Sequence, residues 1–478
     1  MFSSFCVPLV STGRGRRPVR PAAAALVVCG LAVAGVLATA GPAAADGTAA
    51  GQGGAITTVG GLKTYGDAVV HEETGDRQIS AGLFEMSVEG GGTLQTYCVD
   101  LLTPTQKDAK YYETPWSGTS LGANENAGKI RWILQNSYPK VNDLTELARE
   151  AGIGSGLTEQ DAAAGTQVAI WRFSDGAEVE AVDPQAERLA DYLEDKAGST
   201  AEPSASLTLE PPAVSGPPGT LLGPVTVRTG ADSVTVTPPA DAATSGVRIV
   251  DEQGEPVTTA QDGSRLYFDV PADAADGTAE LTVHASTTVP VGRAFASEGR
   301  SQTQILAGSS ESTVTAAASA VWADSGPIPA LSARENCAAG GVDITAVNAG
   351  TKPFTFELLG IEHTIPADTT RTVTVPLLED QAYDFTITGP GGLEQRFSGV
   401  LDCLTQSSGT NDGETTQIFS EPSPATVGGG TSEELNLAES GSSGATPLIG
   451  GVAIGLVVIG GAVLILLRER ERTAPHQD

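Results

Sequence analysis

The spacing of apolar and polar positions changes several times along the chain, and each change predicts a different kind of structure. The first long apolar run covers residues 22–40, between an arginine-containing segment and the small residues Ala43–Ala45. A basic segment, an apolar run and a small-residue site in this order are typical of a secretory signal peptide. We therefore expect residues 1–45 to be a cleaved signal peptide.

The last apolar run predicts a membrane helix. Residues 447–467 contain no charged residue, and the arginine-containing segment 468–478 follows them. At about 1.5 Å per residue, this run spans roughly 30 Å, which is the thickness of a bilayer hydrocarbon core. Arginines beside a membrane helix favour the cytoplasmic side. We expect a transmembrane helix at 447–467, a cytoplasmic tail at 468–478 and an exterior location for residues 46–446.

Residues 46–199 form the first predicted unit, which mixes strands and helices. Two alternating segments, residues 82–88 and 94–101, flank the turn Glu89–Gly92 and predict a β-hairpin. Apolar residues at helical spacing follow, and they predict helices at residues 125–136, 144–151, 159–173 and 184–197.

Two further units have the pattern of β-domains. After a Pro- and Ser-rich linker, residues 200–329 contain short runs of Val and Thr between Gly and Pro turns, which predict an Ig-like β-sandwich. Residues 330–404 repeat this pattern over a shorter length and predict a small β-sandwich. Residues 405–446 are rich in Ser, Thr, Gly, Glu and Pro, and predict a disordered stalk. The fold class is therefore multidomain and mainly β.

Composition agrees with an exterior location and limits the partners. The chain has 58 acidic and 27 basic residues, for a net charge of −31. Such a surface repels nucleic acid, so we expect no nucleic-acid partner. The two β-units show neither a metal-ligand cluster nor an evident catalytic set, so we interpret them as spacers. We expect no metal and no cofactor.

Three cysteines remain after removal of the signal peptide. Cys337 and Cys403 bracket the strand-rich third unit, and an oxidising exterior permits a disulfide between them. Cys98 is then left without a partner. An odd cysteine in an exported protein pairs between molecules, reacts chemically or is inert and buried.

Gln167 is the second residue that carries potential chemistry. It lies on the predicted helix 159–173, whose start has Thr158 and Asp161 at capping-box spacing. Its helical face is otherwise apolar, with Ala163, Ile170 and Trp171 as neighbours. A buried carboxamide needs hydrogen-bond partners or must be changed chemically. On the predicted strand, Cys98 faces away from Tyr97 and Val99, so it could meet Gln167.

Two segments resemble the signatures of Gram-positive thioester-domain surface proteins, also called TQxA-domain proteins. They are Tyr97–Leu101 and Thr166–Trp171, and the intervening Trp132–Pro139 is also similar to that family. The resemblance implies a β-sheet or barrel core with helices, and an internal thioester with sulfur from Cys98 and the acyl carbon from Gln167. It also implies attachment to an amine through an isopeptide bond. Tyr97, Trp116 and Trp171 are candidates to shield the thioester from water, and each could equally be plain core.

The segment Leu437–Gly441 resembles a sortase signal of the LAxTG kind, followed by the apolar helix and the basic tail. Its residues are Leu437, Ala438, Glu439, Ser440 and Gly441. This chain has Ser440 where the family has threonine. Attachment to the cell wall by sortase and retention of the membrane helix both remain open. Either outcome keeps the protein at the cell surface.

Three functions follow from these observations. The first is a covalent adhesin or crosslinker that acts once through Cys98 and Gln167 and is not an enzyme. Its partner is a surface protein or another target that carries an amine. The second is a passive structural surface protein with an unreacted Cys98. The third is a cysteine hydrolase that pairs Cys98 with His71, which matches no catalytic signature.

Overall fold

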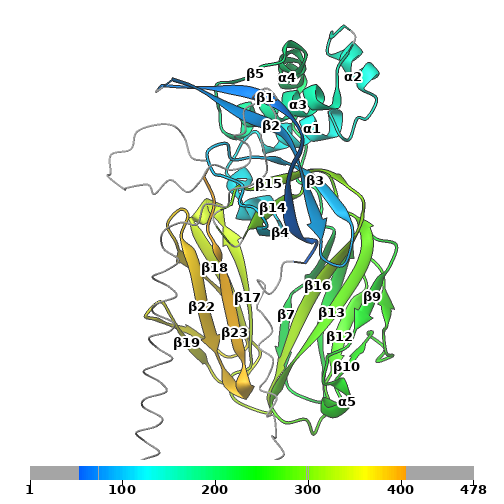
Figure 1. The fold of residues 1–478 in the computed structure, drawn as a ribbon. Helices are drawn as coiled ribbons and strands as arrows, with labels where there is room; N and C mark the ends of the chain where they lie inside the picture. Colours follow the sequence, from blue (N-terminus) through cyan, green and yellow to red (C-terminus); the bar gives the residue numbers. More distant parts are fainter. Residues whose placement is uncertain (1–52, 74, 155, 298, 300, 405–478) are drawn as a thin grey trace, which may run out of the picture.

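The protein is described by a computed structural model that covers residues 53–404 apart from residues 74, 155, 298 and 300 (Figure 1). The predicted signal peptide, stalk, sorting motif, membrane helix and tail lie outside this range. Strands dominate the part of the chain that is covered, which confirms the mainly β prediction. None of its helices is long and apolar enough to cross a bilayer.

The first part of the structure is built on a seven-stranded sheet in the order β2-β3-β15-β14-β4-β1-β5. Strand β1 pairs with both β2 and β4, so that all the strands except β5 close into a ring of antiparallel pairs. This ring is a barrel, as the family resemblance implied. Its members and the outer strand β5 are β1 (Ile56–Glu72), β2 (Gly75–Val88), β3 (Thr93–Cys98), β4 (Lys110–Thr114), β5 (Val179–Ala181), β14 (Ala294–Ser297) and β15 (Gln304–Ser309).

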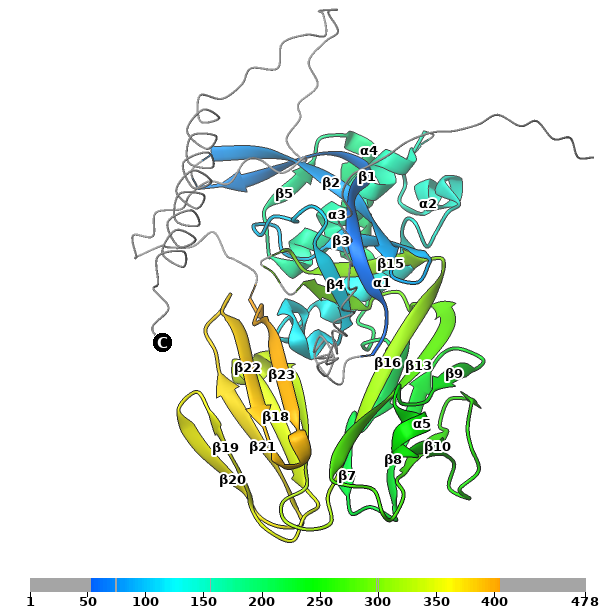
Figure 2. The same cartoon turned by 60° about the horizontal axis from the view of Figure 1, so that its bottom comes forward.

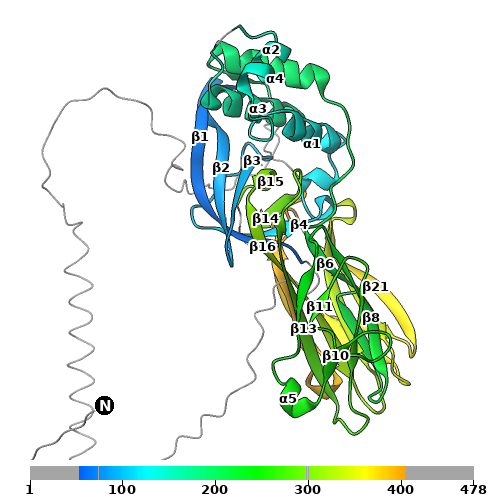
Figure 3. The same cartoon turned by 90° about the vertical axis from the view of Figure 1, so that its right-hand side faces the viewer.

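Four helices cover one end of this barrel (Figures 1 and 3). They are α1 (Ala127–Asn136), α2 (Leu144–Glu150), α3 (Glu159–Ser174) and α4 (Pro184–Lys196), so each predicted helix is present within two residues of its expected ends. Helix α3 begins with the predicted capping box of Thr158 and Asp161. It runs between α4 and the barrel, and a side chain at Gly165 would collide with the backbone of α4 at Ala186.

The second part consists of two sheets around one core. The first sheet has the order β10-β12-β8-β6 and the second the order β11-β9-β13-β16-β7. Their core is continuous with residues inside the barrel, such as Met86, Tyr111 and Phe295. The strands are β6 (Leu207–Glu210), β7 (Ala213–Gly216), β8 (Leu221–Thr229), β9 (Val234–Thr237), β10 (Arg248–Val250), β11 (Thr259–Ala260), β12 (Arg265–Asp269), β13 (Gly277–Thr288) and β16 (Glu311–Trp322), with the short helix α5 (Ala242–Ser245) between β9 and β10.

Strands β14 and β15 belong to the barrel although they lie within the range predicted as the second unit. β15 pairs with β3 and β14 pairs with β4, in both cases antiparallel. The chain therefore leaves the barrel after residue 199, builds most of the second part and returns to complete the barrel. Residues 46–199 alone lack two of its strands, which the linear division into units did not anticipate.

The third part has its own core and lies beside the second part, below the barrel (Figures 1 and 2). Its main sheet has the order β17-β18-β21, and two hairpins, β19-β20 and β22-β23, complete it. The predicted disulfide is present between Cys337 and Cys403. The strands are β17 (Pro329–Asn336), β18 (Gly341–Asn348), β19 (Phe354–Leu358), β20 (Ile361–Ile365), β21 (Thr369–Pro376), β22 (Ala382–Thr388) and β23 (Glu394–Val400).

Candidate thioester site

Cys98 and Gln167 lie against each other in the interior of the first part. The backbone N–H of Cys98 donates to Oε1 of Gln167 at 3.0 Å, and Nε2 of Gln167 donates to the backbone carbonyl of Cys98 at 2.9 Å. Cys98 is the last residue of β3, and Gln167 is in the middle of α3. The structure therefore brings together the two residues that the sequence analysis paired, and this pair of bonds fixes the carboxamide beside the cysteine.

Both residues are more deeply buried than the strand pattern suggested. The alternation along the strand predicts that the face with Tyr97 and Val99 is core and that the face with Cys98 is distinct. In the structure, every residue from Thr96 to Asp100 is buried, on both faces. Helix α3 is likewise buried from Ala162 to Trp171, so Gln167 does not lie on a single apolar stripe. The reason is that α3 packs against this strand, while β15 and Thr105 surround its end at Cys98.

The sulfur of Cys98 has polar neighbours from a distant part of the chain. Gln304 donates from Nε2 to Sγ of Cys98 at 3.2 Å, and Thr105 lies with its hydroxyl 3.8 Å from the same sulfur. The hydroxyl of Thr96 fixes Oε1 of Gln304 at 2.8 Å, and the hydroxyl of Thr105 donates to Oε1 of Gln302 at 2.7 Å. Sequence reasoning missed these glutamines, because only the pairing of β15 with β3 places them beside Cys98.

Burial also controls the chemistry of the thiol. Loss of water around Cys98 raises the pKa of its thiol to about 12, and the charges of Asp100 and Asp175 act in the same direction. Hydrogen bonds from Gln304 and Thr105 oppose this shift. The unreacted thiol is therefore protonated at neutral pH and hidden from reagents in solvent.

Comparison with known families identifies the segment that contains Cys98 and Gln167. Residues 95–199 match the family model described as "Thioester domain", and this match includes both Cys98 and Gln167. The chain carries a thioester domain. Residues 329–400, in the third part, match a second family model, "Bacterial phospholipase C, C-terminal domain", which the sequence analysis did not anticipate.

Two solved structures are also similar to this chain. The Bacillus anthracis TIE protein is 15% identical, with 74% of this chain and 81% of that chain covered and a TM-score of 0.26. The thioester domain of the Enterococcus faecium TIE86 protein is 17% identical, with 57% and 96% covered and a TM-score of 0.27. No curated protein matches the chain.

The three predicted shielding aromatics all belong to the hydrophobic core that contains Cys98. Tyr97 is fully buried, and its hydroxyl donates to the carbonyl of Tyr138 at 2.8 Å. Trp116 donates from Nε1 to the carbonyl of Gly292 at 2.9 Å. Trp171 lies one helical turn after Gln167, and among the described residues its buried Nε1 has no hydrogen-bond partner. The structure places all three in the core, and their role as a shield for a thioester stays a prediction.

His71 lies away from this interior. Its side chain is partly exposed on β1, where Nδ1 lies 2.8 Å from Asp76 and Nε2 lies 3.8 Å from Glu180. The described neighbours of the buried Cys98 sulfur are instead Gln304 and Thr105. The structure therefore does not supply the Cys–His hydrogen bond on which the hydrolase hypothesis depends.

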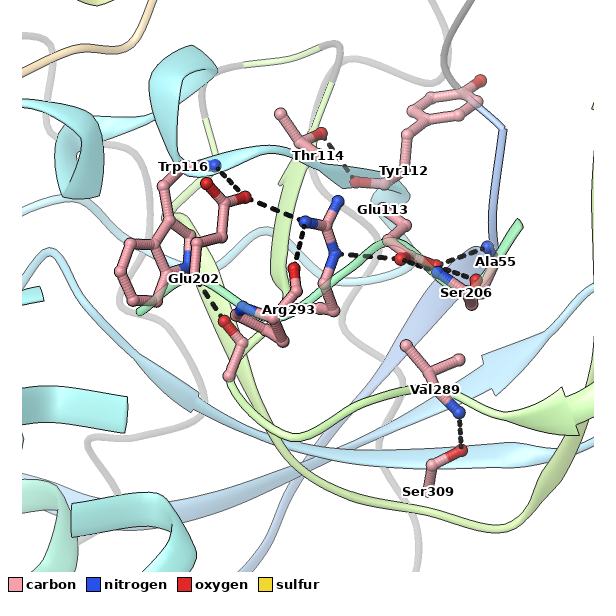
Figure 4. Close-up of polar contacts among 12 residues, drawn as sticks. Ala55, Tyr112, Glu113, Thr114, Trp116, Glu202, Ser206, Val289, Arg293 and Ser309 are labelled. Atoms are coloured by element: carbon pink, nitrogen blue, oxygen red, sulfur yellow. Dashed lines mark hydrogen bonds and ion pairs between the residues drawn. The ribbon is translucent and has the colours of Figure 1, made fainter. Parts of the chain in front are cut away.

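A buried ion pair attaches the thioester domain to the returning chain (Figure 4). Nε of Arg293 lies 2.9 Å from Oε1 of Glu113, and its Nη1 lies 2.9 Å from Oε1 of Glu202. Glu113 also accepts hydrogen bonds from the backbone N–H groups of Ala55 and Ser206. These residues come from the barrel, the linker and the position before β14, so the ion pair joins three separate segments where β14 enters the barrel.

Proposed function

We propose that the protein attaches itself covalently to an amine-bearing target through a thioester between Sγ of Cys98 and the side-chain carbonyl carbon of Gln167. The observation that supports this most directly is the reciprocal pair of hydrogen bonds between the Gln167 carboxamide and the Cys98 backbone. These bonds hold the side-chain carbonyl of Gln167 beside the one residue of this strand that carries a thiol. Both residues also lie inside the matched thioester-domain segment.

Formation of the bond follows from this geometry. The sulfur of Cys98 attacks the Gln167 carbonyl carbon, the carbon–nitrogen bond of the amide breaks, and the thiol proton leaves with the nitrogen as ammonia. The Cys98 N–H already points to Oε1, where negative charge develops during attack, and would stabilise that charge. Gln304 donates to the sulfur and would stabilise it as it loses its proton.

The thioester then acts as a stored electrophile. A target amine attacks the Gln167 carbonyl, the carbon–sulfur bond breaks, and the Cys98 thiol is released together with a new amide bond. Water is the competing nucleophile, and the burial of both residues limits its access. Each molecule reacts once, so the protein is a binder and not an enzyme.

The proposed setting is the surface of a Gram-positive cell. The predicted signal peptide, the segment Leu437–Gly441 and the predicted helix 447–467 support export and anchoring by sortase or by the membrane. The target would be a protein or another surface molecule with an accessible amine. The acidic composition argues against a nucleic-acid partner, because like charges repel.

Intact-mass measurement of the exported full chain tests this proposal. The wild type is expected to be lighter by one ammonia than its mature sequence with the Cys337–Cys403 disulfide formed, and Cys98→Ala and Gln167→Ala should each remove this deficit. The matched control is Gln160→Ala, which alters an exposed glutamine on the same helix and should keep the deficit. A wild type with its full sequence mass and an alkylatable Cys98 would support the passive structural alternative.

A further inference from the structure

The sulfur of Cys98 is in contact with a second glutamine, Gln304. The two residues are direct partners in the pairing of β3 with β15, and Nε2 of Gln304 lies 3.2 Å from Sγ of Cys98. Nε2 is bonded to the side-chain carbonyl carbon, so that carbon is one covalent bond away from an atom in contact with the sulfur. Gln304 is fully buried, which limits the access of water to this carboxamide. The position therefore meets the first requirement for attack by the sulfur, which is proximity.

Thr96 binds the atom of Gln304 on which negative charge would develop. Its hydroxyl donates to Oε1 of Gln304 at 2.8 Å, and Thr96 is itself fully buried. Attack on the carboxamide carbon moves charge onto Oε1, and a fixed donor in a site that excludes water stabilises that charge. The same hydrogen bond can persist in the product, because a thioester keeps this carbonyl oxygen. Thr96 and Gln304 together therefore provide an electrophile with its own oxyanion donor.

The nitrogen of the Gln304 carboxamide can leave with little loss of structure. Its described contacts are with the Cys98 sulfur and with the hydroxyl of Thr105, which accepts from it at 3.3 Å. The new carbon–sulfur bond would replace the first contact. Thr105 would keep the hydrogen bond that its hydroxyl donates to Oε1 of Gln302 at 2.7 Å. Departure of ammonia from Gln304 therefore leaves the surrounding hydroxyl groups with partners.

The carboxamide of Gln167 is held in a different way. Both of its polar atoms are bonded to the backbone of Cys98, whereas the described contacts of the Cys98 sulfur are with Gln304 and Thr105. Loss of the Gln167 nitrogen as ammonia would remove a donor from the buried carbonyl of Cys98, which is unfavourable. An intact Gln167 would instead keep the Cys98 backbone fixed while the sulfur reacts with the carboxamide of Gln304.

We propose that Gln304 is a second acyl donor for Cys98, so that a chain carries its thioester either to Gln167 or to Gln304. In the second case Sγ of Cys98 bonds to the side-chain carbonyl carbon of Gln304, the carbon–nitrogen bond of the amide breaks, and the thiol proton leaves with the nitrogen as ammonia. The two thioesters exclude each other, because Cys98 has one sulfur. This inference rests on the proposed function, since it also requires Cys98 to form a thioester.

Methylamine labelling of the exported full chain, followed by fragment-ion sequencing of its peptides, tests this inference. Methylamine opens a thioester and leaves a methylamide on the residue that supplied the acyl carbon. We expect a methylamide at Gln304 as well as at Gln167, and none at Gln302, the neighbouring glutamine on the same segment. Cys98→Ala is the control for labelling that does not depend on the sulfur, and it should carry no methylamide at any of these residues.

The position of the methylamide separates this inference from the proposed function. A methylamide on Gln167 alone would overturn the inference and leave the proposed function intact. A methylamide on Gln304 alone would support the inference and move the acyl carbon of the proposed thioester to β15. A chain with neither a mass deficit nor a methylamide would overturn both proposals. Gln167→Ala does not distinguish the two donors, because it also removes the bonds that fix the Cys98 backbone.

Thr96→Val tests the donor to Oε1 of Gln304. Valine has nearly the same shape as threonine and lacks the hydroxyl group. The share of methylamide found at Gln304 should fall about tenfold or more, because one such donor contributes about 10²–10³ in rate. Thr57→Val, at a fully buried threonine of β1, is the matched control and should keep the wild-type share. An unchanged share in Thr96→Val would overturn the role assigned to its hydroxyl.

Discussion

The amide of Gln304 donates a hydrogen bond to the sulfur of Cys98 across a sequence separation of 206 residues. Gln304 begins β15, outside the segment 95–199 that matches the thioester-domain family. The environment of the reactive sulfur is therefore completed by chain that returns from the second part. This relationship leads to the first prediction.

Gln304→Ala should lower the fraction of chains that carry the thioester. The substitution removes the donor to the sulfur and leaves the buried hydroxyl of Thr96 without its acceptor, a loss of about 1–3 kcal/mol in stability. Intact mass reports the thioester fraction, and chemical denaturation reports the stability. Gln78→Ala, at an exposed position on β2, is the control and should change neither. An unchanged thioester fraction in Gln304→Ala would show that the sulfur does not need this donor.

Loss of Arg293 should destabilise the protein far more than loss of an exposed arginine. Arg293→Ala leaves the fully buried Glu113 without its counter-charge, which costs about 3–5 kcal/mol. Arg396→Ala breaks an exposed pair with Asp384 in the third part and should cost about 0–1 kcal/mol. Urea denaturation of both variants gives the comparison. Similar small losses would mean that the buried pair does not hold β14 in place.

The barrel topology predicts that residues 46–199 do not fold as a unit. That segment lacks β14 and β15 and exposes the barrel strands β3 and β4 with which they pair. Circular dichroism during heating should show no cooperative transition for residues 46–199, whereas the full chain should show one. A cooperative transition and a mass deficit in the short segment would contradict the view that the returning strands are required.

Glu335 should make the stability of the third part depend on pH. Burial raises the pKa of its carboxyl to about 7, although the hydroxyl of Tyr383 donates to it at 3.0 Å. In the unfolded chain the pKa returns to about 4.3. Between these values the folded state binds more protons, so stability is greatest at the acidic end and falls as the pH rises toward 7.

Glu335→Gln keeps a hydrogen-bond acceptor for Tyr383 and removes the titration. Urea midpoints measured at pH 5 and pH 8 should therefore differ less in this variant than in the wild type. Glu357→Gln, at an exposed position in the same part, should retain the wild-type difference. Equal pH dependence in wild type and Glu335→Gln would contradict the role of Glu335.

The sequence predicted local features better than long-range ones. The four helices of the first part were predicted because periodicity and the capping box of Thr158 and Asp161 lie within single segments. The 82–101 hairpin was predicted for the same reason, since its turn Glu89–Gly92 joins neighbouring strands. The pairing of β15 with β3 was not predicted, because no local pattern specifies a partner more than 200 residues away.

At the candidate site too, residues with a local signal were predicted and residues placed by long-range pairing were not. Cys98 and Gln167 were found from residue type and a family resemblance, and the structure brings them into contact. The roles of Gln302, Gln304 and Arg293 depend on the returning chain and had no signal of their own.

The most direct test of the central claim is mass spectrometry of the exported full chain before and after treatment with methylamine. Before treatment we expect a deficit of one ammonia relative to the mature sequence with its disulfide formed. After treatment, peptide mapping should place a methylamide on Gln167 and find one free thiol at Cys98. A chain with its full sequence mass, no methylamide at Gln167 and a Cys98 thiol that is alkylated on denaturation would contradict the thioester.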